Sequence, residues 1–499
     1  MSTVSVYRPE DVAYRVDRES LIRELRQVLP EDSLIVDEAG RRAYECDGLS
    51  AYRALPLLVA LPATVEQVQG VLRICSRLKV PVVARGSGTG LSGGALPHPQ
   101  GVLLSLSKLD RILELDPERR LARVQPGVRN LAISEAAAPH GLYYAPDPSS
   151  QIACSIGGNV AENAGGVHCL KYGLTVHNVL AVKMVTIDGE LVEIGGSAPE
   201  APGHELLALL HGSEGMLGVV VEVTVKLLPR PPVTKALLAA FDSVQRAGDA
   251  VAAIISAGII PAGLEFMDNP AIRAAEDFVR AGYPVDAAAI LLCELDGHAE
   301  DVEAGLTRVE QLLAEHQATE IRLARNDAER ARFWAGRKNA FPAVGRISPD
   351  YYCMDGTIPR KHLADVLLGI QKLSEQYGLR VVNVFHAGDG NLHPIVLYDG
   401  NKPGELERTE ELGGKILELC IEVGGTISGE HGVGVEKINQ MCVQFSKAEL
   451  EQFFAIKAAF DPDGLLNPGK AIPTLNRCAE FGAMHVHRGQ LPFPELERF

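Results

Sequence analysis

The chain has 499 residues, of which 46% are hydrophobic and 22% charged, and its formal net charge is −16 at pH 7. This length predicts two or three domains with packed cores, and the negative charge argues against binding to nucleic acid or to an anionic lipid surface. No apolar run approaches the ~18–20 residues of a membrane-spanning helix, and the charged N-terminus lacks the apolar core of a signal peptide.

The nine cysteines are an odd number, are scattered along the chain and include no C-x-x-C pair. This pattern predicts a reducing, cytoplasmic location and no iron–sulfur cluster in this chain. Any iron–sulfur relay would then belong to a partner, and contact with the inner face of a membrane would come through partner subunits.

Residues 1–53 are expected to form a lead-in with one helix over 18–29, and residues 54–229 to form the first domain. In that domain a helix over 65–78 is followed by a buried strand over 80–84.

The strand at 80–84 runs into RGSGTGLSGG at 85–94. Its five glycines allow backbone N–H groups to converge on a pyrophosphate, because glycine tolerates positive φ and has no side chain to obstruct the approach. Residues 88–93 match G-x-G-x-x-G, but Pro97 and Pro99 argue against an immediate helix. A Rossmann fold that binds NAD is therefore rejected, and residues 102–106 are predicted to be a strand.

Two more glycine-rich stretches follow, at 146–166 and at 212–218, the second leading into a strand over 219–226. Any one of these loops alone is more simply explained as a turn. Three of them in one domain favour a long ligand that is held along its whole length.

The C-terminal half, residues 230–473, begins after the predicted linker Pro229-Arg-Pro-Pro232. Two strand–helix–strand units are expected there, which predicts a ferredoxin-like α+β domain. Their predicted elements are 236–241, 244–257 and 263–267, then 289–294, 300–316 and 320–324. A further helix is predicted over 448–460, and residues 474–499 form a tail, in which 476–499 either dock onto a partner or lie on their own domain.

Two histidines in the run HAGDGNLH at 386–393 indicate a metal site. If Asp389-Gly390 is a two-residue hairpin turn, His386 faces His393 with Cβ atoms ~5 Å apart. Glu430, in SGEHGVG at 428–434, would complete a three-ligand site with open positions for zinc, manganese or iron. The alternative is that the histidines are ordinary cross-strand polar residues.

These motifs resemble two known families. The loop at 85–94, the blocks 146–148 and 155–163 and the loop at 212–218 are similar to the FAD-binding domain of vanillyl-alcohol oxidase and p-cresol methylhydroxylase (PCMH-type) flavoproteins. The runs around His386, His393 and Glu430 resemble the C-terminal domain of FAD-linked D-2-hydroxyacid dehydrogenases, within which the chain is similar to the flavin subunits of bacterial glycolate oxidases. That similarity includes residues 45–52, 334–341 and 478–499.

The resemblance implies an α+β protein, with a PCMH-type FAD-binding domain followed by a ferredoxin-like FAD-linked oxidase C-terminal domain. It also implies that FAD is bound, and without covalent attachment, because the loop at 85–94 has no histidine, although Cys154 lies near the second loop. The residues that it places around FAD are Arg85, Gly86, Ser87, Gly88, Thr89, Gly90, Gly93, Gly94, Pro146, Asp147, Ser150, Ser155, Gly157, Gly158, Asn159, Asn163, Gly165, Gly166, Glu214, Gly218, Val219 and Asn467.

The implied reaction is oxidation of a 2-hydroxy acid, with hydride transfer to flavin N5. A divalent metal on His386, His393 and Glu430 would bind the substrate hydroxyl and one carboxylate oxygen. The resemblance places His431 at the position of the family's general base. The alternative is that His431 only supports Glu430.

The implied substrate contacts are Arg337, at the position of the family's carboxylate clamp, His431 and Asn391. Lys338 is the alternative to Arg337. Relatives that oxidise dicarboxylates carry a lysine farther downstream of the arginine. Here the downstream segment, residues 348–355, contains no lysine. We therefore expect a small monocarboxylate, with glycolate first and D-lactate second.

Electrons are expected to pass to partner subunits or a quinone and not to NAD, and the expected partners are a second flavin subunit and an iron–sulfur subunit. Two alternatives stay open: a self-sufficient D-lactate or D-2-hydroxyacid dehydrogenase, and a non-catalytic subunit that relays electrons.

Overall fold

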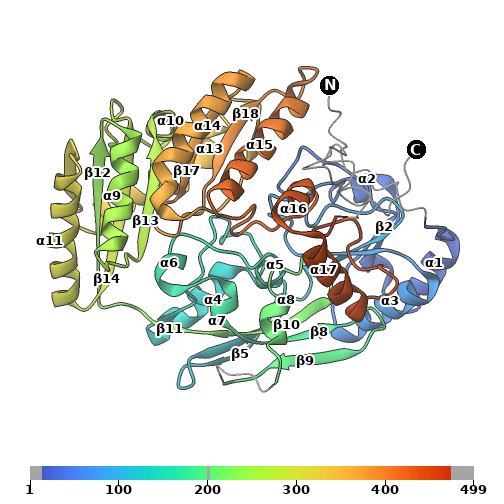
Figure 1. Ribbon diagram of the computed structural model, residues 1–499. Coiled ribbons are helices and arrows are strands. Elements are labelled where there is room, and N and C mark those ends of the chain that lie inside the picture. The colour runs from blue at the N-terminus through green and yellow to red at the C-terminus, as the bar shows by residue number, and fades with distance from the viewer. Residues whose placement is uncertain (1–13, 199–202, 474–499) are drawn as a thin grey trace.

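The computed structural model describes residues 14–198 and 203–473 (Figure 1). The expected docking segment 476–499 lies outside these residues. The described chain builds a four-stranded and a five-stranded sheet and the short pair β7 (Leu142–Tyr143) and β11 (Leu228–Pro229) before residue 230, and a large seven-stranded sheet after it.

A four-stranded sheet opens the flavin half, in the order β1-β2-β4-β3, with β2 and β3 both parallel to β4. Its strands are β1 (Leu34–Ile35), β2 (Leu58–Ala60), β3 (Val82–Arg85) and β4 (Val102–Ser105). Helices α1 (Arg18–Leu25) and α3 (Val65–Leu78) pack on it through one shared apolar core.

Helix α3 shows why the sequence predicts this part well. Its buried residues Val68, Val71, Leu72 and Cys75 follow the spacing i, i+3, i+4, i+7 of one helix face. The helix begins where the Thr64 side chain accepts a hydrogen bond from the Gln67 N–H at 3.3 Å. The predicted range 65–78 is confirmed.

A five-stranded antiparallel sheet follows, in the order β5-β6-β10-β8-β9. Buried and half-buried residues alternate along β10, as expected for a strand with one face in a core. The strands are β5 (Ile112–Asp116), β6 (Leu121–Val124), β8 (Val179–Val185), β9 (Leu191–Gly195) and β10 (Val219–Lys226).

The C-terminal half is built on a seven-stranded sheet in the order β15-β12-β14-β13-β17-β18-β16. Its first four strands, with α9 and α11 as connections, have the antiparallel arrangement of a ferredoxin-like β-α-β-β-α-β unit, so the predicted fold is confirmed. The strands are β12 (Val233–Phe241), β13 (Gly263–Asp268), β14 (Ala289–Gly297), β15 (Glu320–Leu323), β16 (Asp350–Cys353), β17 (Arg380–His386) and β18 (Pro394–Tyr398).

Helices cover both faces of this sheet. Along β12, Leu237, Ala239 and Phe241 belong to one core and Leu238 and Ala240 to the other, because successive side chains point to opposite faces. The first face carries the row of helices seen across the sheet in Figure 1, namely α9 (Val244–Ser256), α11 (Ala299–Glu315), α14 (Leu363–Tyr377) and α15 (Glu405–Glu422). The second face carries α10 (Asn269–Val279), α12 (Asp327–Lys338) and α13 (Ala340–Val344).

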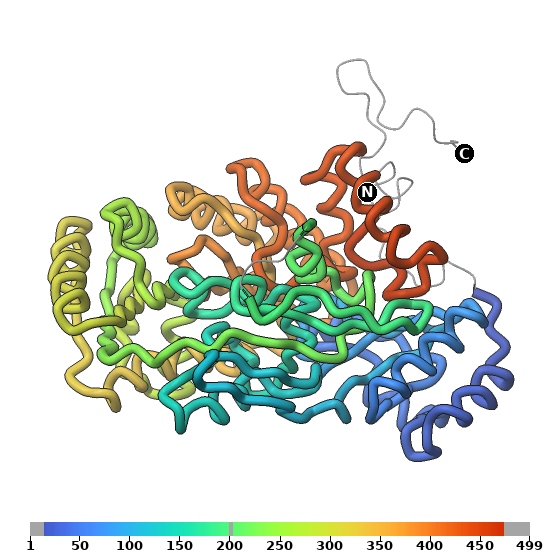
Figure 2. Tube along the Cα trace, turned by 90° about the horizontal axis from the view of Figure 1, so that it is seen from below, coloured from blue at the N-terminus to red at the C-terminus, as the bar shows by residue number. Residues whose placement is uncertain are grey.

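The end of the described chain returns to the flavin half. After α16 (Ile438–Gln444) and α17 (Lys447–Phe460), Leu466 forms a parallel bridge with Val82 of β3. The backbone N–H of Val82 donates to Leu465 O and that of Asn467 donates to Val82 O, each at 2.8 Å. In Figures 1 and 2 the red segment that includes α17 lies at the same end of the molecule as the blue N-terminal helices.

Candidate active site

The hairpin that carries the two histidines has a different register from the predicted one. His386 pairs with Asn391 and not with His393, and Asn383 pairs with Pro394. The connecting loop therefore has four residues, 387–390. Gly390 has a φ of 83°, whereas Asp389 is not among the residues with positive φ, so the two-residue turn, which needs positive φ at both positions, does not form.

The two histidines still share one face, because the register is shifted by two residues, one full repeat of the strand. Their ring centroids are 5.2 Å apart. Glu430 Oε1 lies 2.9 Å from His393 Nε2, 3.4 Å from His386 Nε2 and 3.7 Å from His431 Nε2. The structure thus brings together the four predicted residues of this group, with one carboxylate oxygen at their centre.

Glu430 stays ionised in this setting. Burial raises the pKa of its carboxyl, but the neighbouring His386 and His393 imidazoles outweigh that effect and hold it well below its usual range.

Glu265, on β13, holds His386 in place and was not predicted from the sequence. It lies directly opposite His386 of β17, and its Oε1 is 2.7 Å from His386 Nδ1. Its other oxygen accepts a hydrogen bond from Arg337 Nε at 2.7 Å. Because Nδ1 is occupied, the free Nε2 of His386 faces Glu430. One signal was available: Glu265 is the only charged residue in the apolar run 263–267.

Asp355, just after β16, anchors the loop that carries Glu430 and His431 and was also missed. Its carboxylate accepts hydrogen bonds from Ser428 Oγ at 2.6 Å and from the His431 N–H at 2.9 Å. Burial raises its pKa, but the positive charge around it prevails and lowers it to about 2. Asp355 thus fixes the loop backbone while remaining charged.

His431 faces the other two imidazoles from this loop. Its ring stacks on His393 with centroids 4.9 Å apart and planes 10° apart. Burial lowers the pKa of His431 to about 4, so its imidazole is neutral and has a ring nitrogen that can accept a hydrogen bond. Its Nδ1 is buried and has no hydrogen-bond partner in the described part of the chain.

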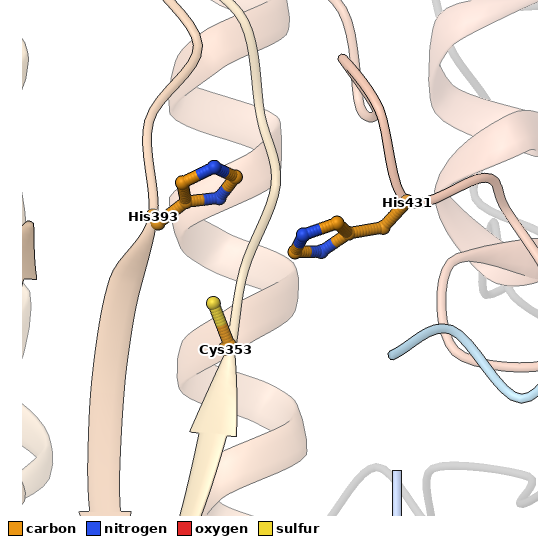
Figure 3. Close-up of side chains that lie close together, drawn as sticks. All are labelled: Cys353, His393 and His431. Atoms are coloured by element: carbon orange, nitrogen blue, oxygen red, sulfur yellow. The ribbon is translucent and has the colours of Figure 1, made fainter. Parts of the chain in front are cut away.

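Figure 3 shows His431 opposite Cys353, which ends β16, and His393, which immediately precedes the neighbouring strand β18. Two sets of side chains in the described residues have donor atoms within 4.8 Å of one another: Cys353 with His393 and His431, and Asp355 with His393, Glu430 and His431. His386 belongs to neither set, so the predicted trio His386, His393 and Glu430 is assembled around Glu430 but is not itself one of these compact sets.

One cavity of about 370 Å³ joins this group to the glycine-rich loops. Lys338, Phe341, Tyr351, His393, Glu430 and His431 line it from the C-terminal half. The predicted cofactor residues that line it are Arg85, Gly86, Ser87, Gly88, Thr89, Gly90, Gly94, Ser150, Ser155, Gly157, Gly158, Asn159, Gly165, Glu214, Gly218 and Val219.

The glycines of this wall leave room for a cofactor. A Cβ on Gly158 would meet only Ser155 Oγ, at 3.3 Å, so the space in front of it is open. A Cβ on Gly165 would collide with the Glu430 carboxylate. The second glycine-rich stretch therefore packs directly against the histidine–glutamate group, and the cavity fits a long ligand beside it.

Six predicted cofactor residues do not line the cavity, and Asp147 and Asn467 among them bind neighbouring segments: Gly93, Pro146, Asp147, Asn163, Gly166 and Asn467. Asn467, for example, donates from Nδ2 to Gly94 O at 2.9 Å and to Glu214 O at 2.6 Å. Asp147 pairs with His168, with Oδ2 2.8 Å from Nδ1.

The three predicted substrate contacts do not all line the cavity. Arg337 is 2% exposed, is bound to Glu265 and does not line the cavity, whereas its neighbour Lys338 does. Asn391 is buried and donates from Nδ2 to Asp355 Oδ1 at 2.9 Å, and it is also absent from the cavity wall. Of the three, His431 alone faces the cavity.

Two family models match this chain: the FAD binding domain over residues 56–195 and the C-terminal domain of FAD linked oxidases over residues 230–471. The "Glycolate oxidase subunit GlcD" of Escherichia coli strain K12 is 68% identical over 97% of both chains. The chain belongs to the FAD-linked oxidases. Another relative of this FAD-linked oxidase, "D-lactate dehydrogenase" of Anaerostipes hadrus, is 31% identical over 90% of this chain and 96% of its own.

A solved structure of p-cresol methylhydroxylase with bound substrate has the same fold as this FAD-linked oxidase, with a TM-score of 0.79. It is 18% identical, and the match covers 92% of this chain and 97% of that one. The predicted fold class and the predicted FAD cofactor are therefore confirmed. In the described part of this oxidase, no helix has the length and apolar character needed to cross a membrane.

Proposed function

We propose that this FAD-linked oxidase oxidises a small 2-hydroxy acid, glycolate first and D-lactate second, to the 2-oxo acid. The observation that carries the proposal is the single cavity lined both by the three glycine-rich loops and by His393, Glu430 and His431. The names of the two relatives, a glycolate oxidase subunit and a D-lactate dehydrogenase, support the same substrate class.

His431 is the residue that we assign to the substrate hydroxyl proton. Its neutral ring faces the cavity, and the contact of Asp355 with its backbone fixes its position. FAD, when bound, supplies the acceptor for the hydride from the substrate carbon. Stacking against His393 limits the rotation of His431, so its nitrogen atoms stay oriented during proton transfer.

A divalent metal fits the histidine–glutamate group by the chemistry of its donors. His386 Nδ1 is held by Glu265, and His393 Nδ1 is 3.3 Å from Met354 O, so both Nε2 atoms are left facing Glu430. His386, His393 and Glu430 would hold zinc, manganese or iron, which suit imidazole and carboxylate ligands. Such a metal supplies Lewis acidity that lowers the pKa of a bound hydroxyl.

FAD is proposed to be bound without a covalent link. The cavity wall contains Cys154, and burial raises the pKa of its thiol, which keeps it in the unreactive protonated form. The cavity-lining histidines, His393 and His431, both belong to the group around Glu430. Acid precipitation is expected to release the yellow colour into the supernatant, and colour retained in the pellet would contradict this.

The reaction is tested by mixing the purified protein anaerobically with glycolate, D-lactate or 2-hydroxyglutarate and following flavin absorbance near ~450 nm, with and without prior chelation. We expect metal-dependent bleaching by glycolate or D-lactate, and a lower kcat/KM for 2-hydroxyglutarate. Preference for 2-hydroxyglutarate would overturn the monocarboxylate assignment. Equal bleaching after complete removal of the metal would remove the metal from the proposal.

Two alternatives have observable signatures. A self-sufficient D-lactate dehydrogenase, which the Anaerostipes relative favours, would reduce a quinone analogue without any other subunit. A non-catalytic electron relay would show no bleaching in protein that contains FAD and metal. The assembled group of His386, His393, Glu430 and His431 favours catalysis over a relay, since a relay has no use for a proton acceptor beside a substrate cavity.

Electrons are proposed to leave through partners. The Escherichia coli relative is named as a subunit, which supports assembly into a larger complex, and the partners that we propose are a second flavin subunit and an iron–sulfur subunit. Copurification of a tagged chain from its native cells is expected to bring down a second flavoprotein together with iron and acid-labile sulfide. A chain that purifies alone and reduces a quinone analogue at full rate would contradict this.

A further inference from the structure

Three side chains at the edge of the histidine–glutamate group carry donor atoms that face one another: Cys353, His393 and His431. The sulfur of Cys353 and one nitrogen of each imidazole lie within 4.8 Å of one another. Figure 3 shows the Cys353 side chain pointing towards the two rings, which stack with their centroids 4.9 Å apart. The proposed reaction uses His393 and His431 and leaves Cys353 without a role.

The other compact set of donors includes Asp355, whose carboxylate already holds the neighbouring loop. It accepts hydrogen bonds from Ser428 Oγ at 2.6 Å, from Asn391 Nδ2 at 2.9 Å and from the His431 N–H at 2.9 Å. A cation on Asp355 would have to break these contacts. Cys353 is therefore the more available ligand beside the two rings.

Cys353 is a buried, free cysteine at the end of β16. Its Sγ donates a hydrogen bond to Met354 O at 3.4 Å, and a thiol is a weak donor. Burial raises the pKa of the Cys353 thiol, so the sulfur keeps its proton until a cation replaces it. Binding breaks the S–H bond, forms a sulfur–metal bond and releases the proton to solvent, with no change in oxidation state.

His431 supplies a second donor that is not yet engaged. Its Nδ1 is buried and has no hydrogen-bond partner within the described ranges of the chain. Metal–ligand bonds of ~2.0–2.3 Å place tetrahedral donors ~3.5 Å apart, so the three donor atoms have to approach one another by about 1 Å. His393 and His431 line the cavity, which gives a cation a path to the set.

The donor types determine which cation this set would bind. A thiolate favours soft, thiophilic cations, and one cysteine with two histidines is a donor set typical of copper. His386, His393 and Glu430 offer nitrogen and oxygen alone. We propose that Cys353, His393 and His431 form a second metal site, which takes a thiophilic cation such as copper(I) or cadmium.

A cation in this second site blocks the enzyme. His393 is common to both sets of ligands, so the cation competes with the proposed catalytic metal. It also occupies a ring nitrogen of His431, the residue assigned to the substrate proton. Binding of the cation does not depend on the reaction, whereas the block rests on the proposed function.

The test uses the full-length, FAD-loaded protein, stripped of metal by a chelator, with cadmium ion as the probe. A cadmium–thiolate bond gives a charge-transfer band in the ultraviolet, which a difference spectrum reports without any turnover. Cys353→Ser removes the sulfur. Cys293→Ser is the matched control, because Cys293 is a buried cysteine on β14 of the same sheet and belongs to neither donor set. Manganese, which prefers oxygen ligands, is the control ion.

We expect cadmium to produce the band in the wild type and in Cys293→Ser but not in Cys353→Ser, and manganese to produce none. His431→Gln should weaken cadmium binding at least ~10-fold, since loss of a group that only orients a metal ligand already costs that much. Glu430→Gln should keep the band. In wild-type protein that retains its own metal, flavin reduction by glycolate should fall as the band grows. Melting temperature and FAD content check that the variants are folded.

A band of full size in folded Cys353→Ser, its loss in Glu430→Gln, or equal cadmium affinity of His431→Gln and the wild type would overturn the site. Undiminished flavin reduction in protein whose band is complete would overturn the block. Failure of the proposed function would look different, because glycolate and D-lactate would then fail to reduce the flavin before any cadmium is added.

Discussion

Glu265 and His386 lie opposite each other on the neighbouring strands β13 and β17, with Glu265 Oε1 2.7 Å from His386 Nδ1. A carboxylate in this position fixes the orientation of a metal-binding imidazole. Glu265→Gln should therefore lower the affinity for zinc or manganese about 10–100-fold in competition titrations with a chelating dye. Asp268→Asn is the control, since Asp268 is on the same strand but binds Asn383. Equal metal affinity in the Glu265 variant and the wild type would contradict the role.

Asp355 offers a second test, because its carboxylate accepts hydrogen bonds from Ser428 and from the backbone of the Glu430–His431 loop. Asp355→Asn replaces one acceptor oxygen with an amide donor, so the loop has to shift. We expect flavin reduction by substrate to slow about 100-fold, as for the loss of one or two hydrogen bonds to a charged group. The control is Asp350→Asn, at the start of β16, which contacts Gly400 N at 2.9 Å. Slowing of similar size in the control would point to general damage to the sheet.

His168 connects the two halves of the molecule and should make stability depend on pH. Its Nδ1 is 2.8 Å from Asp147 Oδ2 and its Nε2 is 3.3 Å from Glu294 Oε1. Burial lowers the pKa of His168, but the two carboxylates outweigh this and raise it to about 10. An unfolded histidine titrates near ~6.5, so the stabilisation is complete below that pH and is lost as the pH rises towards 10.

At pH 6, His168→Gln should therefore lower the free energy of unfolding, measured in urea, by roughly 2 kcal/mol relative to the wild type. This figure is reduced from the full pKa shift because the side chain is 27% exposed. This difference in the free energy of unfolding should be smaller at pH 9.5. His316→Gln, at the end of α11, provides the comparison and should show little change. A gap of the same size at both pH values would rule out the ion pairs as its cause.

Gly158 tests the position of the cofactor. It lines the cavity, and a Cβ there would meet only Ser155 Oγ, at 3.3 Å. Gly158→Val should leave the protein folded but place two methyl groups in the space for FAD, and we expect the ratio of absorbance near ~450 nm to that near ~280 nm to fall severalfold. Gly196→Ala is the control, since nothing lies within 4 Å of its Cβ position. Full FAD content in the Gly158 variant would place the cofactor elsewhere.

Helices and strands whose apolar residues repeat at a regular spacing were predictable from the sequence. Helix α3 and strand β10 begin and end where the pattern of apolar residues predicts. The ferredoxin-like order of β12 to β15 also followed from the alternation of strands and helices. These features depend on residues close together in the chain, where burial and spacing decide the structure.

The details of the site depend on contacts between distant segments, and a local signal such as the lone charge of Glu265 in an apolar run does not show which residue it contacts. Glu265 and His386 are separated by 121 positions, and only the pairing of β13 with β17 joins them. The hairpin turn was assigned from its Asp-Gly pair, but the loop has four residues. Likewise, the sequence could not decide between Arg337 and Lys338, because the packing of α12 determines which of them turns inwards.

The bridge between Val82 and Leu466 joins positions 384 residues apart. The sheet that leads into the first FAD loop is therefore missing an edge until nearly the whole chain has left the ribosome. This edge of the sheet is completed only when the segment after α17 has folded back onto β3. We therefore expect FAD to be held fully only by a chain whose C-terminal half is already in place.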